Sequence, residues 1–487
     1  MNSENRDHDS GLRGGALGVG ALVLMVVSAV APLTNMAAVL PIAILFGNGT
    51  AIVPAFFIML AILLVFIGGF VLLAKHVRNA GAFYNLIGVG LGRRGGGAAA
   101  AVALLGYNAM QIGASGLFGP AASSLVRNFT GQVVPWWVFS IAASIVIGLL
   151  AYRRIDFSVK ILGFLVMGEF AAIFILDLLI IHQGVPGGFS LAPISLSGMP
   201  SISALAVTFV FAFGCYAGFE ATVVYREETK NPDRTVPRAT YLAVLIIGIF
   251  YTVSTIWIIE GAGTDGVVKM ISELADPVDF VFIVADRYAG SWLVGIMRIL
   301  FVSSVFAALL AFHNHTARYF YFLGREGFLP SWLGKTHETY QSPARATVLQ
   351  TIIAVTVIAI FAIAGADPLL TLFAWVANVS ILCIISMMVA VTVAIVVYFR
   401  RNPDLEPNRP YATLVSPIVS GVCFLAIGIT GFFGFDILTG TTGPAAYALP
   451  MLIPIAAVFG ILRSDRLKLD LVHGEFAEAA QTSNLQS

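Results

Sequence analysis

The chain has 487 residues, of which 58% are hydrophobic and only 11% are charged, and its formal net charge is +1. Because soluble globular domains carry about 25% charged residues, this composition excludes that class. The near-neutral charge gives no indication of a nucleic-acid partner. The three cysteines lie scattered in apolar segments, without the spacing of a disulfide framework or a metal site.

Apolar runs of about 20 residues, long enough to cross the hydrocarbon core of a bilayer, recur along the chain. They predict an all-α polytopic membrane protein with about twelve transmembrane helices. The predicted spans are 17–46, 52–75, 97–126, 134–152, 157–181, 203–225, 237–259, 291–318, 343–365, 369–399, 412–435 and 443–463. The first is interpreted as a retained span, because no small-residue cleavage site follows it.

The distribution of Lys and Arg predicts the orientation of these spans. If the N-terminus is cytoplasmic, 23 of the 27 Lys and Arg residues fall in cytoplasmic segments. The four exceptions are Arg127, Lys269, Arg287 and Arg298. We therefore expect a multi-pass protein of the cytoplasmic (plasma) membrane, with both polar tails, 1–14 and 466–487, in the cytoplasm.

Pro32 interrupts the first span, which reads SAVAPLTNMAAVLP over residues 28–41. Proline removes a helical donor and suits the first position of a new helix, so helix 1 is predicted to break here. The amides of Leu33 and Thr34 would then lack helical partners at the positive end of a half-helix, which suits a carboxylate. A simple proline kink is the alternative when this residue is taken alone.

The sixth span carries Gly214, Gly218 and Glu220 in its middle. A bilayer tolerates non-helical backbone only where protein or water satisfies the freed amides, and such breaks mark binding sites in secondary transporters. The glycines could instead serve helix packing, but a carboxylate at membrane depth is costly and functional by default. We expect Glu220 at the start of the inner half-helix, where the dipole favours its charge.

Broken helices five spans apart predict two inverted five-helix repeats followed by two C-terminal helices. The repeats would cover residues 15–182 and 183–401, and helices 11 and 12 residues 402–465.

Three motifs then indicate a family. The sequence YAGFE at 216–220, followed by EETKNP at 227–232 and by RTVPRA at 234–239, resembles the signature of the amino acid–polyamine–organocation (APC) permeases. NAGAFY at 79–84 is similar to the loop after span 2 in that family. NHTAR at 314–318 with REGFLP at 325–330 is similar to the end of span 8.

The resemblance implies a LeuT-type fold and transport of amino acids or related amines, often with proton coupling or exchange. It also implies that the α-carboxylate and α-amino group of the substrate lie against the broken backbone of helices 1 and 6. The matching positions are Ala31, Pro32, Leu33, Thr34, Phe213, Gly214, Cys215, Tyr216 and Ala217. Many relatives have a bulky aromatic gate where this chain has Gly214, which predicts a gap that admits a large apolar substrate side chain.

Glu169 is the first candidate for coupling, and Glu220 is the second. Glu169 lies about 18 Å from the cytoplasmic end of span 5, near the bilayer midplane. In several proton-coupled relatives a lysine near this position stands in for a bound sodium ion. A carboxyl group here could titrate or join a cation site, whereas the alternative is a buried acid paired with an arginine or a backbone amide.

Metal and cofactor sites have little support in the sequence. Ser303 and Ser304 in span 8 are candidate sodium ligands, although small residues more often serve helix contacts. No other metal site is indicated. The sequence ending at Gly334-Lys335-Thr336 does not match a phosphate-binding loop, because Leu329 occupies the position of its first glycine. No nucleotide or other cofactor is therefore expected.

We therefore predict a secondary active transporter that imports an amino acid by alternating access, with protons as the coupling ion. An amino acid/amine exchanger, a polyamine carrier and a sodium-coupled symporter are alternatives of the same class. A membrane-embedded enzyme would need paired acids or a His/Asp cluster at depth, which the sequence does not offer, so no enzymatic activity is expected. A non-transporting sensor that has kept the fold is the remaining alternative. The expected partners are the amino acid, protons or sodium, and the lipid bilayer, with no oligomeric state predicted.

Overall fold

The computed structural model describes residues 17–77, 83–153, 159–194, 202–224, 226 and 229–467. These residues form helices and connecting turns, with one isolated bridge between Leu17 and Thr229. The helices are α1 (Val19–Val30), α2 (Pro32–Thr34), α3 (Leu40–Phe46), α4 (Ile52–His76), α5 (Phe83–Thr130), α6 (Trp136–Tyr152), α7 (Val159–Gln183), α8 (Ile202–Gly214), α9 (Ala221–Val224), α10 (Pro232–Ala262), α11 (Val267–Ser272), α12 (Asp279–Ala289), α13 (Ser291–Arg325), α14 (Ala344–Ile363), α15 (Ala374–Arg401), α16 (Ser416–Phe433), α17 (Phe435–Thr439), α18 (Ala445–Ala448) and α19 (Leu452–Leu462).

Ten helices in the described part of the chain are long and apolar enough to cross a membrane. They correspond to ten of the predicted spans. The predicted fourth span is the shorter apolar helix α6, and the predicted sixth span is the interrupted pair α8 and α9. The all-α polytopic fold class is thus confirmed.

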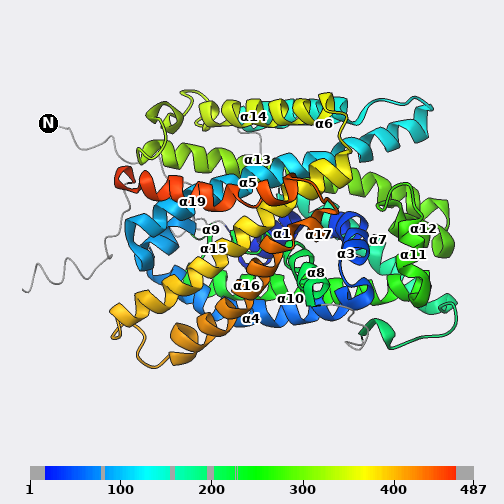
Figure 1. The fold of residues 1–487 in the computed structure, drawn as a ribbon, viewed down its shortest axis with the longest axis horizontal. Coiled ribbons are helices and arrows are strands. Elements are labelled where there is room, and N and C mark those ends of the chain that lie inside the picture. The colour runs from blue at the N-terminus through cyan, green and yellow to red at the C-terminus, as the bar shows by residue number, and fades with distance from the viewer. Residues whose placement is uncertain are drawn as a thin grey trace, which may run out of the picture.

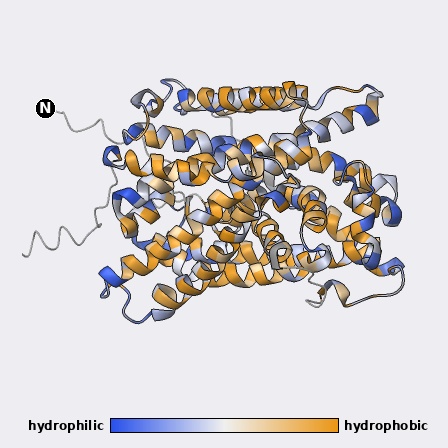
Figure 2. Cartoon of the chain, viewed as in Figure 1, coloured by the Kyte–Doolittle hydropathy of each residue, from blue (hydrophilic) through white to orange (hydrophobic). Residues whose placement is uncertain are grey.

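The long helices run roughly side by side across the molecule (Figure 1). Helices α14 and α6 pack together along one edge, and α4 and α10 pack together along the opposite edge. Hydrophobic residues cover the lengths of the helices, whereas hydrophilic residues gather at their ends (Figure 2). This is the pattern expected of helices whose sides face lipid or one another.

The third predicted span, residues 97–126, lies within α5, which begins at Phe83. Gly92 interrupts it with a φ of +72°, which turns a short first segment away from the long one. Both tails lie outside the described residues except 466 and 467, and so do 79–82 and 227–228 of the family motifs.

Both predicted helix breaks are present. Ala31 separates α1 from α2 with φ 52° and ψ 71°, and Pro32 begins the next helix. Helix α8 ends at Gly214, and a turn over 215–220 leads to α9. Within that turn Gly218 has a φ of +115°, which only glycine adopts readily. The first break lies against α7 and α13, and this contact sets up the site described next.

Candidate functional site

The break in helix 1 is held by a carboxylate from helix α7. The backbone amide of Leu33 donates to Oε2 of Glu169 at 3.0 Å. The hydroxyl of Ser304, on α13, donates to the same oxygen at 2.9 Å, and Thr34 donates to the Ser304 hydroxyl at 3.0 Å. Glu169 is only 1% exposed. Three helices distant in sequence therefore meet at one buried carboxyl group.

The two oxygens of Glu169 differ in their surroundings. The Leu33 amide and the Ser304 hydroxyl both donate to Oε2. Such hydrogen bonds favour the ionised carboxylate, whereas burial disfavours it. Among the described residues, none bonds Oε1 and none forms an ion pair with Glu169. A buried acid at this position was expected to pair with an arginine or with a backbone amide. Among the described residues, Glu169 pairs with a backbone amide and not with an arginine.

Asn35 connects the two broken helices. Its side-chain amide donates to the carbonyl of Val30 at 2.8 Å and to the hydroxyl of Tyr251, on α10, at 2.8 Å. A longer contact of 3.4 Å reaches the carbonyl of Cys215 in the second break. The sequence analysis missed this residue. The signal that could have found it is a lone amide side chain directly after a proline-interrupted turn in an apolar span.

Glu220 stabilises the second break from within. Its Oε2 accepts a hydrogen bond of 2.8 Å from the amide of Gly218, and the residue is 4% exposed. It directly precedes the four-residue helix α9, so it lies at the start of the inner segment as expected. Glu220 thus bonds within its own turn, whereas Glu169 bonds a break in another helix.

A cavity of about 70 Å³ lies between the two breaks. Of the residues predicted to bind substrate, Ala31, Thr34, Gly214 and Ala217 line it. The remaining walls come from the rest of the first span, from Phe211 of α8, and from α5, α13, α15 and the turn before α15. They are mostly apolar, with Asn35 and Asn378 as the amide side chains. This arrangement places a small, mostly apolar space beside both helix breaks.

The other predicted binding residues do not line this cavity. They are Pro32, Leu33, Phe213, Cys215 and Tyr216. The Tyr216 hydroxyl donates to the carbonyl of Phe56 at 2.8 Å, and the Phe213 ring packs edge-on against Phe424 at 5.8 Å. Leu33 and Cys215 contribute backbone groups instead, through the bonds to Glu169 and Asn35.

The gap predicted at Gly214 is not present. A Cβ atom at this position would lie 2.7 Å from Cδ1 of Ile381, on α15. The space that an aromatic gate would occupy is thus filled from another helix, which a sequence motif in span 6 cannot reveal. The expectation of room for a large substrate side chain is wrong.

The two serines predicted as sodium ligands behave differently. Ser304 joins the Glu169 cluster, whereas Ser303 donates back to the carbonyl of Leu300 at 2.9 Å in its own helix. Within the described residues, no group of three or more His, Cys, Asp or Glu could hold a metal ion. The structure therefore brings Ser304, but not Ser303, to the helix break.

Comparison with known proteins supports this architecture. The family model described as amino acid permease matches residues 17–459. The chain is 26% identical to a methylthioribose transporter of Bacillus subtilis, over 59% of this chain and 58% of that protein. It is 25% identical to the branched-chain amino acid permease BcaP of the same organism, over 66% of each. A low-affinity putrescine importer of Escherichia coli is 30% identical over 28% of each chain.

The aligned regions span less than two thirds of the length of these relatives, whereas the family model extends over nearly the whole chain. The motif YAGFE at 216–220 lies in the turn that separates α8 from α9. The chain therefore belongs to the amino acid permease family of the APC superfamily.

Proposed function

We propose that this permease imports an amino acid across the cytoplasmic membrane by alternating access and that protons drive the import. The observation that carries the proposal is the Leu33–Glu169–Ser304 cluster at the helix 1 break, beside a cavity lined by both breaks. A buried carboxyl group without a cationic partner among the described residues is a suitable proton carrier at membrane depth. The two inverted repeats are part of this proposal.

The proposed substrate has a compact apolar side chain. The cavity is small, and alanine, glycine and aliphatic residues form most of its walls. The similarity to a branched-chain amino acid permease supports an apolar amino acid. The similarity to a putrescine importer keeps a carrier of amines as the second candidate.

The proposed coupling arises because Glu169 and the substrate carboxylate compete for the backbone amide of Leu33. A substrate carboxylate at the helix 1 break would need the Leu33 amide, which Glu169 accepts from. Protonation removes the charge from Glu169 and weakens it as an acceptor, so the amide becomes available to the substrate. Linkage then requires that bound substrate favours proton binding by the same factor. The loaded and neutralised site would be free to reorient.

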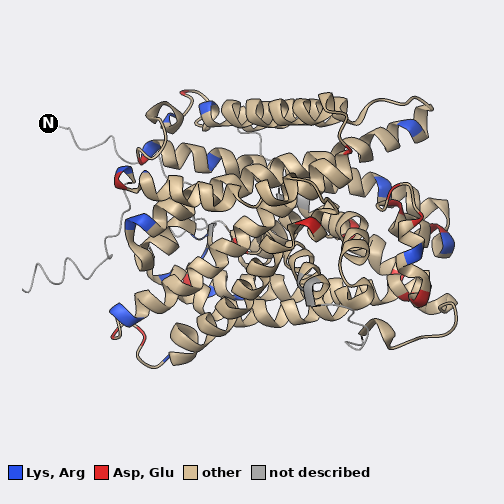
Figure 3. Cartoon of the chain, viewed as in Figure 1, with Lys and Arg blue, Asp and Glu red and all other residues tan. Residues whose placement is uncertain are grey.

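The proposed orientation places both termini in the cytoplasm. It rests on the excess of Lys and Arg in one set of loops, because cytoplasmic loops of membrane proteins are enriched in these residues. Charged residues lie mainly at the two ends of the long helices in the described part of the chain (Figure 3).

Uptake into proteoliposomes tests the proposal. Purified protein would be offered a panel of labelled amino acids with a proton gradient or a sodium gradient imposed separately. We expect an inward proton gradient to drive accumulation of a small apolar amino acid, and the matching decarboxylated amine to compete poorly. Accumulation that follows sodium alone would contradict proton coupling, and equal competition by the amine would favour the amine carrier.

A further inference from the structure

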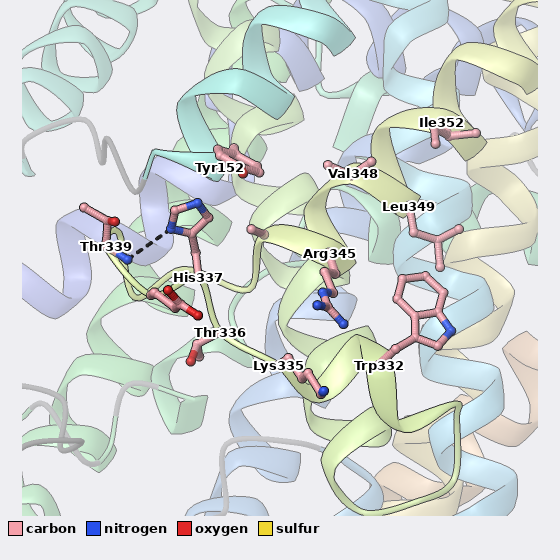
Figure 4. A pocket seen from close by; sticks show the side chains of 12 residues that line it. Tyr152, Trp332, Lys335, Thr336, His337, Thr339, Arg345, Val348, Leu349 and Ile352 are labelled. Atoms are coloured by element: carbon pink, nitrogen blue, oxygen red, sulfur yellow. Dashed lines mark hydrogen bonds between the residues drawn. The ribbon is translucent and has the colours of Figure 1, made fainter.

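A second and larger cavity, of about 550 Å³, lies away from the helix breaks (Figure 4). It is bounded by Tyr152 at the end of α6, by the loop from Trp332 to Thr339, and by the first turns of α14. Since α6 and α14 are apolar helices packed against each other, their neighbouring ends place this cavity at the boundary between hydrocarbon and water.

Two cations face this cavity, and neither has a partner among the described residues. Lys335 and Arg345 both line it, both are exposed, and neither forms a hydrogen bond or ion pair with any described residue. The view in Figure 4 places them near each other, between Trp332 and His337. Among the described residues of the lining Glu338 is the one acid, so these residues together carry a net positive charge. Arg345 also lies in the first turn of α14, where the helix dipole disfavours a cation. An anion bound here would offset that cost.

The same helix face that begins with Arg345 continues as an apolar surface. Val348, Leu349 and Ile352 follow at spacings of three, four and seven residues, which places them on one side of α14. All three line the cavity, and Ile352 is 57% exposed. Trp332, which is 44% exposed, stands beside them, as aromatic residues do at membrane interfaces.

The polar end of the cavity is preformed. Nδ1 of His337 accepts hydrogen bonds from the amides of Thr339 and Tyr340 at 3.2 and 3.3 Å. The His337 ring packs against the ring of Tyr152 at 5.2 Å, and Ser342 donates to the Tyr152 carbonyl at 2.6 Å. The loop that carries Lys335 is therefore tied to the end of α6.

We propose that this cavity binds an anionic phospholipid. The phosphate lies against Lys335 and Arg345, and an acyl chain runs along Val348, Leu349 and Ile352. Charge complementarity selects the anionic headgroup, and the apolar face that continues from Arg345 selects a lipid over a soluble phosphate. Neither feature belongs to the transport site.

Native mass spectrometry of the full-length protein, purified and delipidated in detergent, tests this site. Phosphatidylglycerol and phosphatidylcholine would be titrated separately, and inorganic phosphate would be added as a competitor. We expect the wild-type protein to retain phosphatidylglycerol over phosphatidylcholine. Each cation at a membrane surface contributes a factor of about five in binding, so Lys335→Gln/Arg345→Gln should weaken phosphatidylglycerol binding roughly 25-fold.

Two controls make the result specific. Arg93→Gln/Arg94→Gln removes the same charge from exposed residues outside the cavity and should leave binding unchanged. Ile352→Ser should weaken lipid binding, whereas a soluble phosphate would not be affected by this change. Thermal unfolding of each variant would confirm that it is folded. The preference of the wild-type protein for phosphatidylglycerol tests the proposal independently of any variant.

Three results would overturn the proposal. They are equal retention of the two lipids by the wild type, an equal loss of binding in the Arg93/Arg94 control, and unchanged binding in the folded Lys335/Arg345 variant. Displacement of the lipid by inorganic phosphate would show that the cavity binds a soluble anion instead.

Discussion

Leu33 and Glu169 lie 136 residues apart in the sequence and are joined by a hydrogen bond of 3.0 Å between a backbone amide and a carboxylate. The bond satisfies a donor that the break in helix 1 releases. It also places a titratable group of the protein where a substrate carboxylate was expected to bind. The proposed transport site and the proposed coupling site are therefore contiguous, and each of the following predictions tests one part of that arrangement.

Ser304→Ala is expected to change the pH dependence of uptake. The substitution removes a donor to the ionised carboxylate of Glu169, and hydrogen bonds to charged groups contribute about 1.5–3 kcal/mol. The protonated form is then favoured, so the pH of half-maximal uptake should rise by about one unit. Ser303→Ala is the matched control, because the Ser303 hydroxyl donates to the carbonyl of Leu300 in its own helix. Equal pH profiles for the two variants would show that Ser304 does not act on Glu169.

Asn35→Asp should impair both stability and transport. The substitution replaces a donor by a carboxylate that faces the carbonyl of Val30, and loss of a buried hydrogen-bond partner costs about 1–3 kcal/mol. Tyr251→Phe removes only one of the acceptors of Asn35 and should cost less. Thermal unfolding in detergent and uptake would be measured for both. A larger loss in Tyr251→Phe would place the critical contact on α10 and not between the breaks.

The space beside Gly214 is expected to set the size limit of the substrate. Gly214→Ala should reduce uptake because its Cβ would lie 2.7 Å from Cδ1 of Ile381. Ile381→Val removes that Cδ1 atom, at a stability cost of about 0.5–1.5 kcal/mol, and should admit larger side chains. The double variant should recover the uptake that Gly214→Ala loses. Strictly additive losses would indicate that the two residues do not share this space.

Gly218→Ala should destabilise the protein by about 1–3 kcal/mol, because its φ of +115° strains any residue with a side chain. Gly20→Ala, in the regular part of α1 with no neighbouring atom within 4 Å of the added Cβ, is the control and should be neutral or stabilising. Thermal unfolding measures both. An unaffected Gly218→Ala variant would mean that the turn over 215–220 can adopt another conformation.

The sequence was sufficient for features that depend on local chemistry. Pro32 and Gly218 each predict a helix break, because proline interrupts the helical hydrogen bonds and glycine readily adopts a positive φ. The burial of Glu169 agrees with its predicted place in the middle of an apolar span. These predictions needed no knowledge of which helices pack together.

The contacts between helices could not be predicted in the same way. Three such contacts depend on how the helices are rotated and packed. Ile381 lies in the space beside Gly214, and Asn35 reaches the carbonyl of Cys215. Ser304 bonds Glu169, whereas Ser303 bonds its own helix. A single sequence shows the hydrophobic periodicity of a helix, but it does not show which helix packs against each of its faces. Four of the nine predicted binding residues therefore line the cavity between the breaks, and five do not.

Proton coupling through Glu169 is tested most directly by comparing two modes of transport in Glu169→Gln. Glutamine resembles the protonated acid in volume and keeps an oxygen that can accept from the Leu33 amide. Reconstituted into proteoliposomes, the variant would be assayed for exchange of internal for external substrate and for accumulation driven by a pH gradient. The account predicts that exchange persists while accumulation is lost. Accumulation against a gradient with the wild-type pH profile would contradict it.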